Sequence, residues 1–311
     1  MILCIGTTPA AQRVMVFRKL TLDAVNRAVT TVDGVAGKSV NVAKVLKTLG
    51  EHPVAIGFLG GDRGEYLRAL LEARGIELDF VTVATRTRQC VTLLDTAAGT
   101  HTELVEESQP VSAADYEALM RVIRRRIKGC RAVVMSGTIT PGGPKDLYFR
   151  GTQLAHEVGA MSVIDAQGAA LTEALAAKPS LVKPNRVELA ATAGRELNDE
   201  AAIRVAMREL CERGALRVVV TAGKDPTLAF DGRSFWKIQT PRIEATNPIG
   251  SGDAFTAALV WRLLHGEGLA EACRWASAAG AANALTVMAG EVHPSDVKRL
   301  FEETNAELLK G

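Results

Sequence analysis

The sequence predicts an α/β protein with a mostly parallel central sheet and a second, small sheet. Short apolar runs, typical of buried strands, alternate with segments whose apolar residues recur at helical spacing. Such alternation favours a parallel sheet covered by helices. The alternation breaks at residues 14–32 and 89–105, where strands follow one another without a helix, and these stretches predict the small sheet. With 311 residues, 47% of them hydrophobic, the chain is long enough for one large core.

The first third of the chain contributes strands to both sheets. The opening run, Ile2 to Gly6, is apolar and ends in Gly-Thr-Thr-Pro, which indicates a buried strand and a turn. The predicted elements of this part are strands at 2–6, 14–20 and 28–32, a helix at 42–49 closed by Gly50, a strand at 54–58 and a helix from 60 to 74.

A hairpin around Ala97-Ala98-Gly99 comes next, and the strand–helix alternation resumes after Pro110. The predicted elements from there on are a helix at 113–128, a strand at 132–136, a helix at 145–158, strands at 162–165 and 181–182, helices at 186–193 and 200–213, a strand at 216–221, a hairpin at 228–230 and 234–238, and helices at 254–264, 269–287 and 295–309.

Charge and cysteine patterns exclude several classes of function. The net charge is +2, and the short cluster Arg124 to Arg126 falls on an amphipathic helix, so we expect no nucleic-acid partner. No apolar stretch is long enough to cross a membrane, so we expect no membrane partner either. The five cysteines are scattered without metal-ligand spacing, which predicts reduced thiols and a cytoplasmic location.

The stretch from Asn247 to Phe255 is the strongest candidate for a functional site. Gly250, Ser251 and Gly252 precede a long apolar run, so they would lie at the N-terminus of a buried helix. Free N–H groups and the positive end of the helix dipole make that position suited to a phosphate. Asp253 follows directly. Such an acid can simply complement the dipole, or it can act as a general base that accepts a proton from an attacking hydroxyl.

Loops that carry glycine and polar residues follow four strands, at Gly37, Gly60, Ser136 and Gly223. In open parallel sheets, ligands gather at the carboxyl ends of the strands. The first loop contains Gly37-Lys38-Ser39 but is not a P-loop, because Val32 stands where that motif needs its first glycine. Its lysine is either a solvated surface group or a point charge that holds a substrate phosphate.

Four motifs occur in order along the chain, namely Gly37-Lys38-x-x-Asn41-Val42-Ala43, Ser136-Gly137-Thr138-x-x-Pro141-Gly142, Lys183-Pro184-Asn185-x-x-Glu188-Leu189 and Asn247-x-x-Gly250-x-Gly252-Asp253. This ordered set resembles the ribokinase-like (PfkB) carbohydrate kinase family over essentially the whole chain. The segments that make it most similar to the branch of 1-phosphofructokinase and tagatose-6-phosphate kinase are Val25 to Ala28, Gly57 to Gly61, Thr87-Arg88 and Thr102-Glu103.

The resemblance implies a single three-layer α/β/α kinase domain over residues 1–311, with lid strands inserted at about 12–34 and 86–107. It also implies a homodimer formed through the lid. Asp253 resembles the catalytic base of the family, and Gly250, Ser251 and Gly252 resemble its anion hole.

The resemblance further implies which residues hold the cofactors and the substrate. Asn185 and Glu188 resemble the pair that organises Mg²⁺, through water, together with the phosphates of ATP. The other positions that match the nucleotide site are Lys183, Thr221, Gly223 and Asn283. The positions that match the substrate site are Gly37, Lys38, Asn41, Arg88, Ser136 and Gln12, of which Lys38, Arg88 and Ser136 correspond to groups that hold the phosphate of a phosphosugar.

The segment Thr8 to Gln12 departs from the Asn-Pro-Ala-x-Asp of this branch, whose Asp grips sugar hydroxyls. Gln12 can donate and accept hydrogen bonds but carries no charge. We expect an ATP-dependent kinase that acts on a sugar phosphate of the fructose-1-phosphate or tagatose-6-phosphate type. A neutral sugar or another small alcohol is the alternative substrate. A non-catalytic binding relative is the alternative class, although binding alone does not need the base Asp253.

Overall fold

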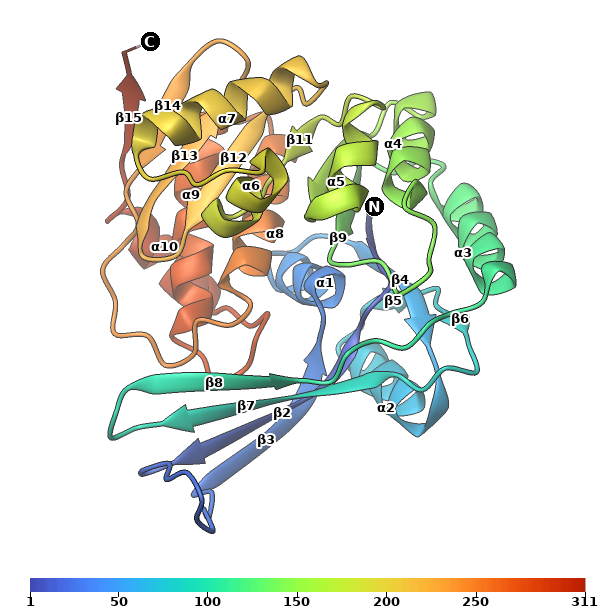
Figure 1. The fold of residues 1–311 in the computed structure, drawn as a ribbon, viewed down its shortest axis with the longest axis vertical. Coiled ribbons are helices and arrows are strands. Elements are labelled where there is room, and N and C mark those ends of the chain that lie inside the picture. The colour runs from blue at the N-terminus through green and yellow to red at the C-terminus, as the bar shows by residue number, and fades with distance from the viewer. Residues whose placement is uncertain (311) are drawn as a thin grey trace.

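A computed structural model describes residues 1–310, and in it a large sheet lies between two layers of helices (Figure 1). The strand order of this sheet is β15-β14-β13-β12-β11-β10-β9-β1-β4-β5, and β6 pairs with β4 off this path. Its strands are β1 (Ile2–Gly6), β4 (Pro53–Leu59), β5 (Glu77–Leu78), β6 (Val81–Thr82), β9 (Ala132–Ser136), β10 (Met161–Asp165), β11 (Leu181–Val182), β12 (Val218–Ala222), β13 (Asp225–Phe230), β14 (Phe235–Ile238) and β15 (Ala306–Leu309). The strands from β5 to β12 in this order pair in parallel, whereas β13, β14 and β15 pair antiparallel.

The helices form two hydrophobic cores, one against each face of the sheet. The first face is covered by α1 (Lys38–Thr48), α2 (Gly61–Ala73), α8 (Ser251–Leu264), α9 (Leu269–Ala284) and α10 (Pro294–Phe301). The second face is covered by α3 (Ala113–Arg126), α4 (Leu147–Glu157), α5 (Gly168–Leu175), α6 (Arg186–Ala193) and α7 (Glu200–Glu212). The predicted α/β/α layering is therefore confirmed. No helix within residues 1–310 combines the length and the apolar character needed to cross a membrane.

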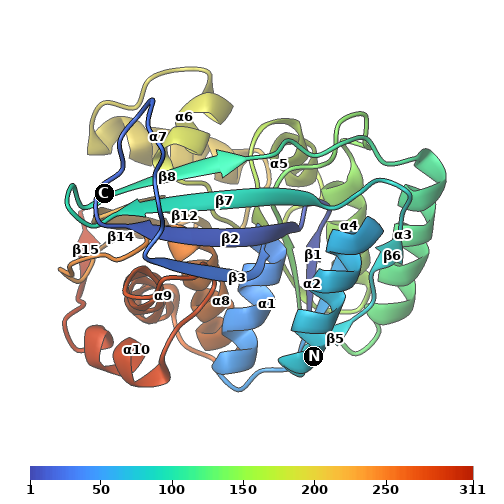
Figure 2. The ribbon, with the colours of Figure 1, turned by 90° about the horizontal axis from the view of Figure 1, so that it is seen from below.

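The small sheet consists of β2 (Ala10–Phe17), β3 (Thr30–Ala36), β7 (Arg88–Asp95) and β8 (Thr100–Val105), in the order β3-β2-β7-β8. It projects from the main domain below α1 and α8 in Figure 1, and its strands cross in front of the main domain in Figure 2. The two segments where the strand–helix alternation breaks therefore form a separate sheet, as predicted. The middle pair, β2 and β7, is parallel and joins the two hairpin-like halves.

The short strands β5 and β6 were not predicted, and β2 begins and ends earlier than the expected 14–20. Two further parts of the chain differ from the predicted secondary structure. The helix expected over residues 295–309 ends at Phe301, and Ala306–Leu309 instead forms β15 at the edge of the sheet, antiparallel to β14. Thr304 ends the helix, because its N–H and its hydroxyl both donate to the carbonyl of Phe301. The helix α5 was not predicted, although it buries Leu171 and Leu175 in the second core.

Candidate active site

The carboxyl ends of four neighbouring parallel strands bring the predicted polar residues to one edge of the main sheet. Ser136 ends β9 and is the register partner of Asp165, which ends β10. Lys183 directly follows β11, and Thr221 of β12 forms a parallel bridge with Asn185. Ligands gather at this edge in open parallel sheets, and motifs far apart in the sequence meet here.

The loop before α8 has the backbone geometry of an anion site. Gly250 is the N-cap residue with φ 84°, a left-handed conformation that glycine adopts without strain. A Cβ at this position would lie 2.8 Å from the Gly290 nitrogen, so the neighbouring segment also requires glycine. Ser251 and Gly252 begin the first turn of α8. The Ser251 N–H donates to the Pro248 oxygen and the Asp253 N–H to the Gly250 oxygen, both at 3.1 Å, so it is the Gly252 N–H that is left for an anion. The ammonium group of Lys183 lies beside this turn, since its Nζ would be 3.8 Å from a Cβ at Gly252. Lys183 therefore adds a positive charge to the site.

Asp253 lies in this first turn and is buried, with 6% of its surface exposed. The Asn41 Nδ2 donates to its Oδ2 at 2.8 Å, which fixes the carboxylate between α1 and α8. Burial, together with the negative charge of Asp165, raises the pKa of Asp253 to about 7, against the opposing effects of Lys38, Asn41 and Lys183. A carboxylate whose pKa lies near neutrality is well matched to accept and release a proton at physiological pH.

Asp165 is the central residue that the sequence analysis missed. It is fully buried, and it accepts from Lys38 Nζ at 3.0 Å, from Lys183 Nζ at 3.1 Å and from the Thr256 hydroxyl at 2.7 Å. Burial opposes its ionisation, but Lys183 and Lys38 hold its pKa down to about 2. The available signal was an acid at the end of an apolar strand, beside the strand that ends at Ser136. Its permanent negative charge orients the two lysines.

Lys38 is the first residue of α1, and its ammonium group lies between two carboxylates. Besides Asp165, its Nζ contacts Glu188 Oε1 at 3.1 Å. Burial alone would lower its pKa, but Asp165 and Glu188 raise it, so the side chain stays charged. A third of the side chain is exposed, at 34%. The predicted contact with a substrate phosphate is therefore compatible with its position, but the lysine is already oriented by the protein.

Asn185 and Glu188 form a capping box at the start of α6. The Asn185 Oδ1 accepts from the Glu188 N–H at 2.8 Å, and the Glu188 Oε2 accepts from the Asn185 N–H at 2.9 Å. Within residues 1–310, no group of three or more His, Cys, Asp or Glu residues is placed to hold a metal ion. Mg²⁺ usually keeps several waters and needs only one or two carboxylates beside substrate phosphates. Each side-chain oxygen of this pair already accepts one hydrogen bond, from Lys38 in the case of Glu188 Oε1, but keeps a further lone pair, so the pair fits a magnesium site reached through water.

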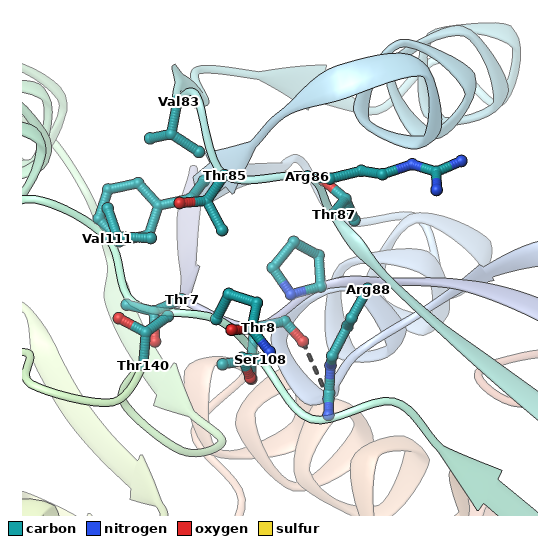
Figure 3. A pocket seen from close by; sticks show the side chains of 13 residues that line it. Thr7, Thr8, Val83, Thr85, Arg86, Thr87, Arg88, Ser108, Val111 and Thr140 are labelled. Carbon is teal, nitrogen blue, oxygen red and sulfur yellow. Dashed lines mark hydrogen bonds between the residues drawn. The ribbon is translucent and has the colours of Figure 1, made fainter.

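Four predicted substrate residues carry buried polar atoms without a partner in the described residues: Arg88 Nε, Ser136 Oγ, Gln12 Oε1 and Asn41 Oδ1. Arg88 begins β7 and donates from Nη2 to the main-chain oxygen of Thr8 at 3.1 Å (Figure 3). Thr8 also approaches the Ser136 loop, because a Cβ at Gly137 would lie 3.7 Å from its hydroxyl. Buried polar groups normally have partners, so these atoms mark a place where a ligand can supply them.

Gln12 lies on β2 of the small sheet, and its side chain is buried. It is 2% exposed, and its Nε2 donates to the Thr92 hydroxyl at 2.6 Å. This leaves its carbonyl oxygen as an acceptor for a hydroxyl group. Gly37, with φ 113°, packs closely against the residue before β2, since a Cβ there would lie 2.8 Å from the Pro9 Cα.

Asn283, which matches a nucleotide-site position of the family, bonds to main-chain groups in the structure. It is fully buried; its Nδ2 donates to the Ile249 oxygen at 2.9 Å, and its Oδ1 accepts from the Gly290 N–H at 2.7 Å. Its side-chain amide therefore holds the loop before α8 by hydrogen bonds, and these groups are not available to a nucleobase. Gly223, with φ 64°, lies in the tight turn between β12 and β13, near the Asn185–Thr221 bridge.

Comparison with known proteins identifies the family. The model of the pfkB family of carbohydrate kinases matches residues 1–295. The chain belongs to the PfkB family. Among solved structures, phosphofructokinase-2 of Escherichia coli in complex with fructose-6-phosphate superposes with a TM-score of 0.87 at 26% identity, over 97% of this chain and 98% of that one. A possible 1-phosphofructokinase of Thermotoga maritima has the same fold, with a TM-score of 0.91 at 23% identity over 99% of both chains.

Family membership makes the protein an ATP-dependent carbohydrate kinase. Kinases of this family use ATP, typically with Mg²⁺. The predicted fold and the predicted class of enzyme are confirmed, whereas the roles of the individual site residues remain predictions.

Proposed function

We propose that this PfkB kinase transfers the γ-phosphoryl group of ATP to a hydroxyl of a sugar phosphate of the fructose-1-phosphate or tagatose-6-phosphate type. The observation that carries this proposal is the set of unpartnered buried atoms at Arg88, Ser136 and Gln12. Two of them belong to groups that can donate to phosphate oxygens, and the third accepts from a hydroxyl. One ligand that carries both a phosphate and hydroxyls would satisfy all three.

The substrate phosphate would bind near Arg88 and Ser136, which both lie close to Thr8. A neutral sugar would leave the Arg88 Nε–H without an anionic partner, and burying an unsatisfied donor of this kind costs about 1–3 kcal/mol. This cost is the physical reason to prefer a phosphosugar over the alternative, a neutral sugar.

Asp253 would act as the base at the other end of the substrate. Its carboxylate, oriented by Asn41, would accept the hydroxyl proton while the hydroxyl oxygen forms its bond to the γ-phosphorus. The bond from that phosphorus to the bridging oxygen of ADP breaks, and ADP leaves with the electron pair. The Gly252 N–H at the positive end of the α8 dipole would stabilise the charge on the transferring group.

Asn185 and Glu188 would hold Mg²⁺ through water, beside the phosphates of ATP. When bound, the ion supplies charge neutralisation at the phosphate oxygens. Lys183, held by Asp165 and lying beside Gly252, would contribute a second positive charge at the same place. Thr221 and Gly223 would line the approach of the nucleotide at the end of β12.

The small sheet would serve as a lid and as the contact of a homodimer. Its outer strand β8 is exposed along its whole length, and the connection between β2 and β3 carries Leu22 and Val25, which are 90% and 84% exposed. Large apolar side chains that are exposed together on one appendage support an interface. A tetrameric inhibited form is known for the related phosphofructokinase-2 of Escherichia coli. Sedimentation of the wild type and of a Leu22→Asp, Val25→Asp variant would test this, since the variant should be monomeric.

A phosphorylation screen tests the proposed substrate. The enzyme with ATP and Mg²⁺ would be assayed on fructose 1-phosphate, fructose 6-phosphate, tagatose 6-phosphate and the corresponding neutral sugars, and the position of the new phosphate would be assigned by NMR. The highest kcat/KM should belong to a sugar phosphate. A neutral sugar as the best substrate would overturn the proposed substrate class.

A further inference from the structure

A buried lysine outside the groups described so far lies behind the loop that precedes α8. Lys44 follows Asn41 by one turn on α1, and 1% of its side chain is exposed. Its Nζ donates to the Ala289 oxygen at 2.6 Å and to the Val35 oxygen at 3.1 Å, and it lies 3.3 Å from Glu291 Oε1. Two of the three ammonium protons are thus donated to main-chain oxygens, and Glu291 pairs with the charge as an ion pair.

The segment that Lys44 holds, Met288 to Glu291, contacts two parts of the candidate active site, namely the loop before α8 and Asn41. On one side, Ala289 and Gly290 pack against Gly250, where a Cβ would lie 3.0 Å from the Ala289 Cα. On another, a Cβ at Gly290 would lie 2.7 Å from the Asn41 Oδ1, so the segment also supports the residue that orients Asp253.

The same segment reaches the small sheet. The Met288 methyl lies so close to Gly34 of β3 that a Cβ there would be only 2.4 Å away. Val35, the next residue of β3, supplies the second acceptor for Lys44. Gly34 is also the register partner of Gln12 on β2. One ammonium group therefore bridges the strand beside Gln12 and the segment behind Gly250.

We propose that Lys44 is a positioning residue for phosphoryl transfer, which fixes the anion loop before α8 and ties it to strand β3 of the small sheet. This inference rests on the proposed role of Gly250 and Asp253. Without the ammonium group, the Ala289 and Val35 oxygens lose a buried donor, and the segment can move away from Gly250. A displacement of about 1 Å in such a support can cost about 10²-fold in rate.

The charges around Lys44 give the proposal a distinct pH signature. Three charged groups face it: Glu291 beside it, Arg74 at the end of α2, which is bound to Glu291 at 2.7 Å, and Asp253 on α8. Burial is the main cause that lowers the pKa of Lys44 to about 8. The positive charge of Arg74 also lowers it, whereas the negative charges of Glu291 and Asp253 raise it. Above that pH a neutral amine has one proton fewer to donate, so kcat should decline on the alkaline side.

The test compares Lys44→Met, Lys44→Arg and Lys47→Met with the wild type. Lys47 lies on the exposed side of the same helix and serves as the matched control. Lys44→Met should lower kcat by about 10²-fold, with a much smaller change in the KM of ATP. Lys44→Arg should recover part of kcat, because a guanidinium group still donates to the carbonyls. Thermal unfolding would establish that each variant is folded.

The pH dependence of kcat separates positioning from a purely structural role. Glu291→Gln removes a charge that favours protonated Lys44, so the alkaline decline should move to lower pH, and Lys44→Met should abolish it. The proposal would be overturned if both variants kept the wild-type pH profile. It would also be overturned if Lys44→Met kept the wild-type kcat. If Lys44→Met fails to fold, Lys44→Arg and Glu291→Gln still decide it. The measurements run on whichever sugar or sugar phosphate is the best substrate, so an error in the substrate class is detected separately.

Discussion

The two ends of the candidate active site satisfy their polar groups in different ways. At the Asp253 end, the protein supplies the partners of both carboxylates: Asn41 holds Asp253, and Asp165 accepts from two lysines and a threonine, while the Asn41 Oδ1 has no partner in the described residues. At the Arg88 end, buried atoms of Arg88, Ser136 and Gln12 have no partner in the described residues. Groups that act on the transferring phosphoryl are thus oriented in advance, which is where preorganisation contributes most to catalysis. Groups that recognise the substrate wait for the ligand to complete their hydrogen bonds.

The largest expected effect separates the two ends most clearly. Asp253→Asn keeps the size of the side chain but removes its basicity, so kcat should fall by about 10²–10⁴-fold, with little change in the affinity for ATP. Steady-state kinetics on the best substrate, supported by single-turnover rates for the chemical step, would measure it.

Asp62→Asn is the matched control for that variant, because Asp62 is the acid in the first turn of α2 and its side chain is 70% exposed. If an acid in a first turn only complements the helix dipole, the two variants should behave alike. Near wild-type turnover of Asp253→Asn would show that the Asp253 end does not supply the base.

At the recognition end, Arg88→Ala should raise the KM of the sugar phosphate and leave its kcat less affected. A charge-assisted hydrogen bond is worth about 1.5–3 kcal/mol, which corresponds to a loss of about 10–150-fold in kcat/KM. The same change should matter little for a neutral sugar. The control is Arg13→Ala, which removes an exposed arginine of β2 that is paired with Asp33 of β3. Equal losses on phosphorylated and neutral substrates would contradict the assignment of Arg88.

The acid side of the pH profile should report on Asp253. Its carboxylate must be ionised to accept a proton, and its pKa is raised to about 7, so kcat should decline as the pH falls through that value. Below it, the decline should approach about tenfold per pH unit for a single required base.

Lys183→Met sharpens this test, because Lys183 lowers the pKa of Asp253 and its loss should move the decline to higher pH. Lys237→Met, which removes a surface lysine paired with Glu200, should leave the profile where it is. A shift of the decline to lower pH in Lys183→Met would contradict the electrostatic account.

The smallest expected effect concerns stability. Asn185→Ala removes one half of the capping box on α6 and should lower the free energy of unfolding by about 0.5–2 kcal/mol. Asp199→Ala removes a comparable cap from α7, because the Asp199 side chain accepts from the Ala202 N–H at 2.7 Å. Urea unfolding should show similar losses for both. Only Asn185→Ala should also raise the KM of ATP. If the two variants had the same KM of ATP, Asn185 would act only as a helix cap.

The sequence predicted the parts of the site that depend on local pattern. Gly250, Ser136 and Lys183 follow or precede recognisable apolar runs, and the motif spacing placed them at one edge of the sheet. Asp165 was missed because its partners lie far along the chain, with Lys38 127 residues before it and Thr256 91 residues after it. The strand β15 was missed for a related reason, since a short segment becomes a strand only through pairing with β14.

Asn283 shows a different limit: it matches a nucleotide-site position of the family, its side chain turns inward, and its role toward a ligand remains a prediction. An asparagine on a buried helix face can serve main-chain groups as readily as a ligand, and the sequence pattern does not distinguish the two. Here the amide completes the hydrogen bonds of the loop before α8.

The hydrogen bond between Asn41 and Asp253 joins residues 212 positions apart, so the order of synthesis affects when the site can form. While a ribosome is still adding α8, helix α1 and the strands around Lys38 have long been available. The entropy of closing so long a loop grows only slowly with its length, by about 0.6 kcal/mol for each doubling. The search for such distant contacts nevertheless slows folding. We therefore expect kinase activity to be the last property that the chain acquires during refolding, after most of its helical signal has returned.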